Sequence, residues 1–377
     1  MSDWFQKRLG EVAPFKYGKA LREEQRQIGA YPVYSSAGIC GFSDEILASK
    51  GIVVGRKGTA GSVFYSDLPF FCIDTAFYID EVFEDCDMKF IYYYMQLMNL
   101  GSFNNDAAVP GLNRNLAHKL KLSTPNFSTQ TRIADILSAY DDAIENNNRR
   151  IALLEQAARE LYREWFVRMR FPGHETVKFV NGLPEGWEIR RLGEFGYITD
   201  GTHDTPKESE SGVPLVTGKC IKGGFIDFNS AYLINEADHK VISRRSGLDS
   251  GDILLSNIGT VGSICVVNYD REFSVKNVII LKPSSSTKTA YLYYLLTSSY
   301  MQDILSAQTN GASQQFVGLT FMRRFKILVP NEPVMENFAK QITPILAEKQ
   351  LLYTKSLNLA HQRDMLLPRL MSGKLEV

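Results

Sequence analysis

The sequence predicts an α+β protein made of two repeated α/β globular domains, each followed by one long helix. Three observations support this class: a heptad pattern in the middle of the chain, a second one near its end, and a set of motifs that occurs twice in the same order. The expected parts are globular domains at 1–127 and 187–330, long helices at 128–170 and 331–377, and a connector rich in Gly and Pro at 171–186.

The first long helix is predicted from the spacing of its apolar residues, which alternates between four and three positions. That spacing is typical of a helix that packs along another helix. A helix from about Ser128 to Arg168 would be roughly 60 Å long at 1.5 Å per residue. Only Asn147 interrupts the apolar pattern. The positions are Ile133, Leu137, Tyr140, Ile144, Asn147, Ile151, Leu154, Ala158, Leu161 and Trp165.

The second long helix is predicted between Asn331 and Met371. Pro344 lies inside it and indicates a short first helix or a kink near Thr343. The two long helices either pair with each other or dock separately on their own globular domains, and the length of the patterns favours pairing. The heptad positions are Ile345, Leu352, Leu359 and Leu366, with Leu346, Tyr353, Ala360 and Leu367 beside them.

The repeated motifs indicate a diverged tandem duplication. Strand-like runs between Gly- and Ser-rich turns predict a curved, mainly antiparallel sheet in each copy. Four landmarks occur in the same order: the pattern Trp-x3-Arg-Leu-Gly-Glu at Trp4 and at Trp187, Gly58–Ser62 and Gly259–Ser263, tyrosine-rich segments at Tyr92–Tyr94 and Tyr291–Tyr294, and strands that end at Pro125 and Pro330.

Composition limits the possible classes. Lys plus Arg and Asp plus Glu are both 42, so net charge does not point to a nucleic acid. The five cysteines show no CxxC spacing, which argues against a zinc site and a disulfide framework and suits a reducing compartment. The N-terminal residues do not resemble a signal peptide, and no apolar run has the length of a membrane span. We expect a soluble, cytoplasmic protein.

No motif indicates catalysis. The segment Gly55–Ser62 superficially resembles a phosphate-binding loop but lacks the Gly-Lys-Ser/Thr ending, so a tight hairpin is the better interpretation. The histidines are isolated, and GxSxG and HExxH are absent. The chain contains no Pro-Pro, so the amino-methyltransferase motif is absent too. We expect no catalytic residues and no metal site.

Two similar domains set apart by a helical rod suit a two-part target such as a pair of DNA half-sites. Arg, Lys, Asn and Gln can read base edges, and hydroxyls or lysines can hold phosphates. Any single one of these residues is more often an ordinary surface residue. The candidates lie in Gly- or Pro-rich loops: Arg56, Lys57, Thr59, Asn113 and Arg114 in the first copy, and Thr202, His203, Lys207, Lys219, Lys222, Asn257, Thr260, Gln314 and Gln315 in the second.

Several stretches together resemble the specificity (S) subunit of type I restriction–modification enzymes, over essentially the whole chain. The most specific are ELYREWFVRMRFPGHE from Glu160, NGLPEGWEIRRLGE from Asn181 and RDMLLPRLMSGKLEV from Arg363. TDGTHDTPK from Thr199 and GDILLSNIGTVGS from Gly251 resemble the recognition domains of that family.

The resemblance implies that each globular unit is a target recognition domain for one half of a bipartite DNA site. The two helices would form an antiparallel coiled coil that sets the gap between the half-sites and docks methyltransferase (M) subunits, two per chain. Restriction (R) subunits would join through that complex, and no membrane partner is implied. The chain itself would be non-catalytic and bind no cofactor, because S-adenosylmethionine, ATP and Mg²⁺ would belong to the partner subunits.

Residues at the helix ends are implied to lie where subunits meet. Asn147 would either fix the register of the coil or lie at a solvated helix edge. The base-contacting residues are chosen by loop position and side-chain chemistry and not by matching, because recognition domains in this family differ widely between members. The expected subunit-interface residues are Asn147, Trp165, Phe166, Leu367, Pro368, Arg369 and Leu370.

Two other functions were weighed against this one. The chain could itself methylate or cleave DNA, but the missing methyltransferase motif and the lack of clustered acidic residues argue against that. It could also be a scaffold with two peptide- or protein-binding domains, which no feature of the sequence favours.

Overall fold

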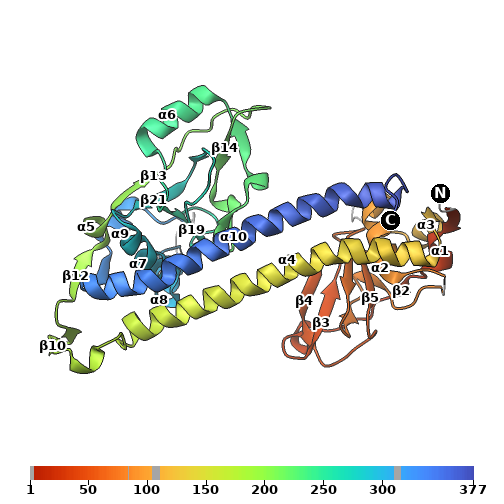
Figure 1. Ribbon diagram of the computed structural model, residues 1–377, viewed down its shortest axis with the longest axis horizontal. Helices are drawn as coiled ribbons and strands as arrows, with labels where there is room; N and C mark the ends of the chain where they lie inside the picture. Colours follow the sequence, from red (N-terminus) through yellow and green to blue (C-terminus); the bar gives the residue numbers. More distant parts are fainter. Residues whose placement is uncertain (1–3, 84, 104–110, 310–315) are drawn as a thin grey trace. The chain divides into compact units, whose positions relative to one another are not determined.

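The computed structural model describes residues 4–83, 85–103, 111–309 and 316–377. The chain divides into two compact units: unit 1 comprises Met1–Asn146 and Ser356–Val377, and unit 2 comprises Asn147–Lys355. Each unit contains a globular part and portions of the two long helices, α4 (Phe127–Tyr162) and α10 (Glu332–Met371), as Figure 1 shows.

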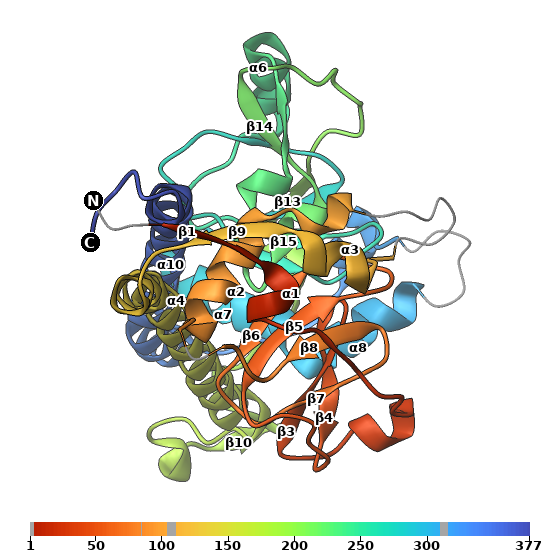
Figure 2. The ribbon, with the colours of Figure 1, turned by 90° about the vertical axis from the view of Figure 1, so that its right-hand side faces the viewer.

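Unit 1 is built on two small sheets and one two-stranded ladder. The antiparallel sheet β2-β8-β5-β6 consists of Lys16–Tyr17, Ala76–Ile79, Gly51–Gly55 and Val63–Ser66. The sheet β4-β3-β7 consists of Gly38–Ser43, Tyr31–Ser35 and Phe71–Cys72, and its β3–β7 pair is parallel. Strand β1 (Phe5–Arg8) pairs with β9 (Lys121–Thr124). The helices are α1 (Leu9–Val12), α2 (Met88–Leu97) and α3 (Arg114–Lys119), with 3-10 turns at Glu23–Arg26 and Leu100–Ser102. Figure 2 shows α1 and α3 near the β1–β9 pair.

Unit 2 repeats this plan with additions. Its sheet β13-β21-β18-β19 consists of Tyr197–Asp200, Val278–Lys282, Ile253–Ser256 and Ile264–Val266. Its sheet β17-β14-β20 consists of Tyr232–Ile234, Val213–Val216 and Ser274–Val275. Strand β12 (Glu188–Arg191) pairs with β22 (Lys326–Val329), β15 (Ile221–Lys222) with β16 (Phe225–Ile226), and β10 (Phe179–Val180) with β11 (Leu183–Pro184). The helices are α5 (Leu192–Phe195), α6 (Glu236–Ser246), α7 (Ser286–Thr297), α8 (Ser299–Thr309) and α9 (Leu319–Arg324), with short turns at His174–Thr176, Gly218–Cys220 and Phe228–Ser230.

The predicted duplication is confirmed by topology and by local detail. Both units have a four-stranded antiparallel sheet and a three-stranded sheet with one parallel pair, in the same strand order. The backbone N–H of Arg8 donates to Oε2 of Glu11 (3.1 Å), and that of Arg191 donates to Oε2 of Glu194 (3.4 Å), so each copy starts its first helix in the same way. The β15–β16 hairpin and α6 lie between the matching strands of unit 2 and contribute to its greater length.

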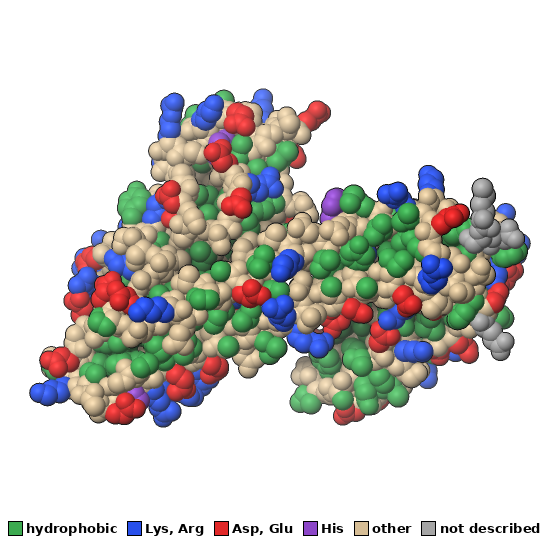
Figure 3. Space-filling model, in the orientation of Figure 1, with side chains coloured by type: hydrophobic (Ala, Val, Ile, Leu, Met, Phe, Trp, Pro, Cys, Tyr) green, Lys and Arg blue, Asp and Glu red, His purple; other side chains and the backbone are tan. Residues whose placement is uncertain are grey.

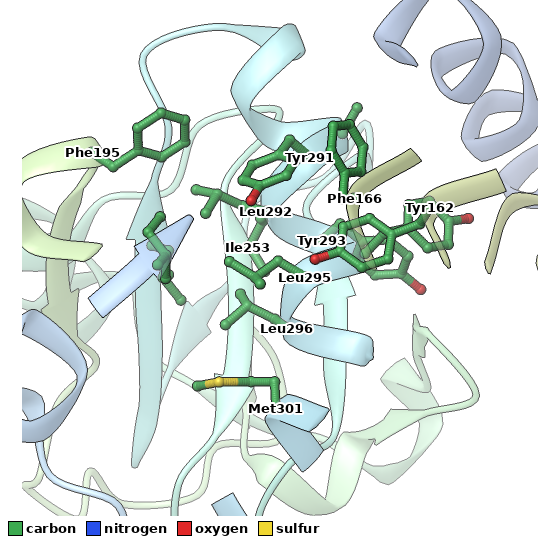
Figure 4. Packing of buried hydrophobic residues seen from close by; sticks show 14 of the residues in the cluster. Tyr162, Phe166, Phe195, Ile253, Tyr291, Leu292, Tyr293, Leu295, Leu296 and Met301 are labelled. Atoms are coloured by element: carbon green, nitrogen blue, oxygen red, sulfur yellow. The ribbon is translucent and has the colours of Figure 1, made fainter. Parts of the chain in front are cut away.

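The apolar pattern of α4 is confirmed, because every position assigned to it is buried or half-buried. In unit 1, Ile133 and Leu137 belong to the same buried cluster as Leu367 and Leu370 of α10. The core of unit 2 brings together residues from α4, the turn that follows it and α7; Figure 4 shows Phe166 beside Tyr291, with ring centroids 5.0 Å apart. Each long helix therefore pairs with the other and also docks on the globular parts, so the two alternatives left open by the sequence both hold.

Within each unit the two long helices run antiparallel. In unit 1, Asp141 of α4 forms an ion pair with Arg363 of α10. In unit 2, Arg150 pairs with Glu348 at 2.7 Å, whereas Tyr162, further along α4, faces Phe338, which comes earlier in α10 (6.2 Å between centroids). The antiparallel arrangement implied by the resemblance is therefore present.

Two details of the long helices differ from expectation. Helix α10 runs unbroken through Pro344, so the predicted short first helix is wrong. Pro344 and Lys340 are both exposed, so water can bond the Lys340 carbonyl that proline leaves without a donor. Helix α4 ends at Tyr162 and continues as a π turn at Arg163–Val167, which buries both Trp165 and Phe166.

Candidate nucleic-acid interface

The Gly-rich loop after β5 is a hairpin that joins the antiparallel strands β5 and β6, as expected. Gly58 and Gly61 have φ of +76° and +82°, values that favour glycine. The equivalent Gly259 and Gly262, after β18 of unit 2, have φ of +76° and +93°. The same loop is therefore built at the same end of the same sheet in each unit.

In unit 1, all five predicted DNA-contacting residues come to this end of the sheet. The backbone N–H groups of Arg56 and Lys57 donate to the Thr75 oxygen at 2.9 and 3.0 Å. The N–H of Leu112 donates to the Arg56 oxygen at 2.8 Å, which places Asn113 and Arg114 next to this loop. Two segments far apart in sequence thus present their polar side chains together.

The environments of these five residues differ. The guanidinium carbons of Arg56 and Arg114 lie 4.9 and 4.8 Å from the centroid of the Tyr17 ring. Lys57 and Thr59 are exposed. Asn113 is the N-cap of α3, because its Oδ1 accepts from the N–H groups two and three residues on (2.9 and 3.2 Å). Its side chain therefore already has a structural role.

In unit 2, two candidates are not surface groups. Asn257 is 1 % exposed, and its amide donates to the Val317 oxygen at 3.4 Å, so its expected exposure is wrong. The cause is the segment of Val317, whose N–H donates to the Asn257 oxygen and covers the residue. Thr202 is 7 % exposed, and its hydroxyl accepts from the N–H of Asp204 (3.1 Å).

Two other candidates of unit 2 are held by acidic neighbours. His203 places Nε2 2.8 Å from Oδ2 of Asp200 and Nδ1 2.9 Å from Oδ1 of Asn277. Lys222 donates to Oδ2 of Asp227 at 2.8 Å, and this contact lowers the pKa of Asp227. The charge of Lys222 is therefore balanced within the unit, and both ring nitrogens of His203 already have partners.

The remaining candidates of unit 2 are exposed: Lys207, Lys219 and Thr260. Gly218 lies close to the loop that carries Thr260, because a Cβ atom added to it would be 3.6 Å from the backbone oxygen of Ile258. The turn that carries Lys219 therefore packs beside that loop. Gln314 and Gln315 lie outside the described residues. Figure 3 shows Lys and Arg interspersed with Asp and Glu on the visible face over α6, without a single-sign field there.

Sequence reasoning missed Tyr17 and Lys276. Tyr17 belongs to the short strand β2 and carries no motif, although it contacts both arginines. Lys276 donates to the Thr205 hydroxyl at 2.6 Å and pairs with Thr202 in an isolated parallel bridge. Only the fold brings these residues to the predicted loops.

Most of the expected subunit-interface residues are buried within their own units. Trp165, Phe166, Leu367 and Leu370 are at most 6 % exposed, and Asn147 is 9 % exposed rather than at a solvated edge. Pro368 and Arg369 are exposed on the last turn of α10. Direct contact with another protein is therefore open to Pro368 and Arg369, whereas Trp165, Phe166, Leu367 and Leu370 anchor the helix ends and Asn147 is buried in the middle of α4.

Each unit has an apolar pocket where a helix end meets the tyrosine-rich helix. Pocket A in unit 1 has a volume of about 400 Å³, and pocket B in unit 2 about 570 Å³. Pocket A is lined by Tyr94, Leu97, Met98, Phe103, Leu120, Lys121, Pro368, Met371 and Ser372. Pocket B is lined by Tyr162, Phe166, Val167, Leu183, Ile189, Tyr291, Leu295, Ser298, Tyr300, Phe325, Lys326, Ile327 and Leu328.

The pockets occupy equivalent positions in the two copies. Lys121 and Lys326 are the first residues of the equivalent strands β9 and β22. Both pockets are closed on one side by α2 or its equivalent α7, and on another by the end of a long helix. Duplication has therefore produced two related apolar sites.

In the part of the chain that the structure describes, no three His, Cys, Asp or Glu residues are grouped to hold a metal ion. All five cysteines are free thiols. Within the same described ranges, no helix combines the length and apolar character needed to cross a membrane.

Comparison with known proteins identifies the family. The family "Type I restriction modification DNA specificity domain" matches residues 1–156 and 184–352. The type I restriction enzyme MjaIX specificity subunit of Methanocaldococcus jannaschii is 23% identical over 313 residues, covering 77% of this chain and 69% of that protein. The HindI specificity subunit of Haemophilus influenzae is 22% identical over 332 residues, covering 68% of this chain and 69% of that protein.

The fold has a solved counterpart. The crystal structure of the S subunit of a type I restriction–modification system from M. genitalium aligns with a TM-score of 0.65 at 18% identity, covering 98% of this chain and 96% of that one. The two family matches coincide with the two copies found in sequence and topology. The chain belongs to the type I restriction–modification DNA specificity family and carries two copies of its domain.

Proposed function

We propose that the two units each read one half of a bipartite DNA site, while the helix pair sets the gap between the halves and docks methyltransferase subunits. The observation that carries this proposal is the repeated loop. The same glycine-dependent hairpin lies at the same end of equivalent sheets, and the side chains it presents differ between the copies.

The difference between the copies supports two distinct half-sites. The registers of the central strands make Asn257 the equivalent of Arg56. Gly55, which precedes Arg56, pairs with Ala76, and Ser256, which precedes Asn257, pairs with Val278 at the equivalent position of unit 2. Unit 1 therefore presents arginine where unit 2 has a buried amide. The two units therefore offer different side chains to DNA at equivalent positions of the repeated loop, as expected of two half-sites that are bound differently.

The two apolar pockets support docking of two copies of one partner. Pockets A and B are equivalent by duplication, and each lies at a helix end where the resemblance to specificity subunits implies contact with methyltransferase subunits. In this proposal the partners carry out methyl transfer and DNA cleavage and bind S-adenosylmethionine, ATP and Mg²⁺, and this chain is non-catalytic.

The test is co-expression with a methyltransferase (M) subunit from the same organism, followed by mapping of N6-methyladenine in host DNA. The expected result is co-purification of the two proteins and methylation at a two-part motif with one constant gap. Co-purification without new methylation would contradict the recognition role, and failure to co-purify would contradict the docking role.

A further inference from the structure

The side chains of Arg56 and Arg114 form a close pair of positive charges on unit 1. Both guanidinium carbons lie under 5 Å from the same Tyr17 centroid, so they are no more than about 10 Å apart. No carboxylate forms an ion pair with either residue within the described ranges. Two guanidinium groups at one ring, with no carboxylate partner among the described residues, favour the binding of an anion there.

Both guanidinium groups are held close to the protein surface. Arg56 also lies 5.7 Å from the Phe77 ring and donates from Nη1 to the backbone oxygen of Asp74 at 3.3 Å. Nε of Arg114 is buried without a hydrogen-bond partner. The charge of Arg114 is also felt at His118, whose pKa is lowered by burial first and by Arg114 second.

Tyr17 is the element common to both arginines. Its ring is packed edge-on against Phe77 at 5.1 Å, and the residue is 47 % exposed. A cation over an aromatic face is stabilised by the ring quadrupole, which restricts the guanidinium to a small region. A residue that orients both cations without contacting DNA itself would be a positioning residue.

We infer that Arg56 and Arg114, positioned by Tyr17, bind phosphate of the DNA backbone at the first half-site; this inference rests on the proposed function. The ring contacts hold both guanidinium groups near the protein surface, and backbone phosphates lie on the outside of the duplex, where such groups meet them first. Arg also offers paired N–H donors that match phosphate oxygens.

Unit 2 does not repeat this arrangement. In unit 1, Tyr17 pairs with Phe77, and in unit 2, Asp200 pairs with Ile279. Phe77 and Ile279 face equivalent positions of the central strands β5 and β18. Asp200 therefore stands where unit 1 has Tyr17. Asn257 stands in place of Arg56. The acidic Asp200 is bound instead by Arg245 and His203. The arginine pair therefore belongs to one half-site only.

The experiment uses the complex with its methyltransferase subunit and a duplex that carries the site found by methylation mapping. Affinity is measured over a range of salt concentrations for wild type, Arg56→Gln, Arg114→Gln and the double variant. Loss of each phosphate contact should reduce the slope of log affinity against log salt by about 0.9. The matched control is Arg132→Gln, an exposed arginine of α4 in the same unit, with an expected unchanged slope.

Two further readouts separate phosphate binding from base reading and from a folding defect. Tyr17→Phe should bind like wild type because the ring face is kept, and Tyr17→Ala should show a smaller salt slope. Wild-type protein should also lose affinity for a duplex in which single phosphates of the first half-site are replaced by neutral methylphosphonate, and the double Arg variant should not.

The outcomes are distinguishable. An unchanged salt slope in the double variant, or a relaxed preference for one base of the first half-site, would overturn this inference and leave the proposed function standing. A wild-type complex with no preference for the mapped site would overturn both.

Discussion

The hydroxyl of Tyr93 donates a hydrogen bond of 2.6 Å to Oδ2 of Asp141, which joins α2 to α4 in unit 1. The same carboxylate forms an ion pair with Arg363 of α10. One aspartate thus ties the tyrosine-rich helix to both long helices. In unit 2, Glu155 of α4 does the same with Tyr294 of α7 (3.3 Å) and Lys349 of α10.

Tyr93→Phe removes the hydroxyl and leaves the ring in place. A hydrogen bond to a charged group contributes about 2 kcal/mol, so the free energy of unfolding of unit 1 should fall by about that amount. Chemical denaturation followed by fluorescence measures the change. Tyr140→Phe, which alters a half-buried tyrosine of α4, is the control, and an equal loss in both variants would contradict a specific role for the Tyr93 contact.

Lys349→Met leaves Glu155 without its buried partner. Lys349 is 4 % exposed, and Glu155 keeps Arg159 at 2.7 Å, so the loss of Lys349 should cost about 1–3 kcal/mol. The second variant, Glu155→Leu with Lys349→Met, removes both charges and should recover most of that loss. If the double variant is no more stable than Lys349→Met, the stability of unit 2 does not depend on this charge pair.

The same ion pair predicts a pH dependence. Burial alone would raise the pKa of Glu155, but Lys349 and Arg159 outweigh it and hold the pKa below its ordinary value of 4.5. The stability from this group is therefore present above about pH 4.5 and is lost as pH falls through the lower folded-state pKa. Thermal unfolding from pH 7 to pH 3 should show a steeper acid loss for wild type than for the variant with both charges removed.

Periodicity and repetition in the sequence predicted the parts of the fold that depend on local pattern. The heptad positions from Ile133 to Leu161 are on the buried side of α4, because a helical stripe of that spacing has to pack against something. The paired glycines Gly58 and Gly259 have the same positive φ, because the hairpin requires that backbone conformation.

Other features depend on contacts between distant segments and left no local pattern. Asn257 is buried because the segment of Val317 pairs with it, 60 residues further on. Tyr17 meets Arg56 and Arg114 only after the sheet has formed. Pro344 is accommodated because its turn of α10 faces solvent, which helix propensity alone does not reveal.

Lys57→Ala should weaken DNA binding and reduce the salt slope, because Lys57 is exposed on the hairpin beside the arginine pair. Lys222→Ala is the comparison: its ammonium group is already bonded to Asp227 and Ser230, so the loss should be smaller. Salt-dependent affinity measurements on both variants test this. Equal effects would mean that the internal pairing of Lys222 does not matter for binding.

The pockets predict the number of docked methyltransferase subunits. Leu97→Asp in pocket A and Ile189→Asp in pocket B place a charge on exposed lining positions, 42 % and 60 % exposed. Each single variant should bind one subunit instead of two, and the double variant none, by native mass spectrometry. The control is Val241→Asp on α6, which is 67 % exposed and lines neither pocket; two subunits bound to every variant would exclude the pockets as docking sites.

If each unit reads its own half of the DNA site, exchange of one globular part should change only that half. Residues 1–127 are replaced by the matching domain of a relative with a different known site, and N6-methyladenine is mapped in cells that also contain the methyltransferase subunit. We expect a motif in which one half changes while the other half and the gap are retained. A motif in which both halves change, or neither does, would contradict it.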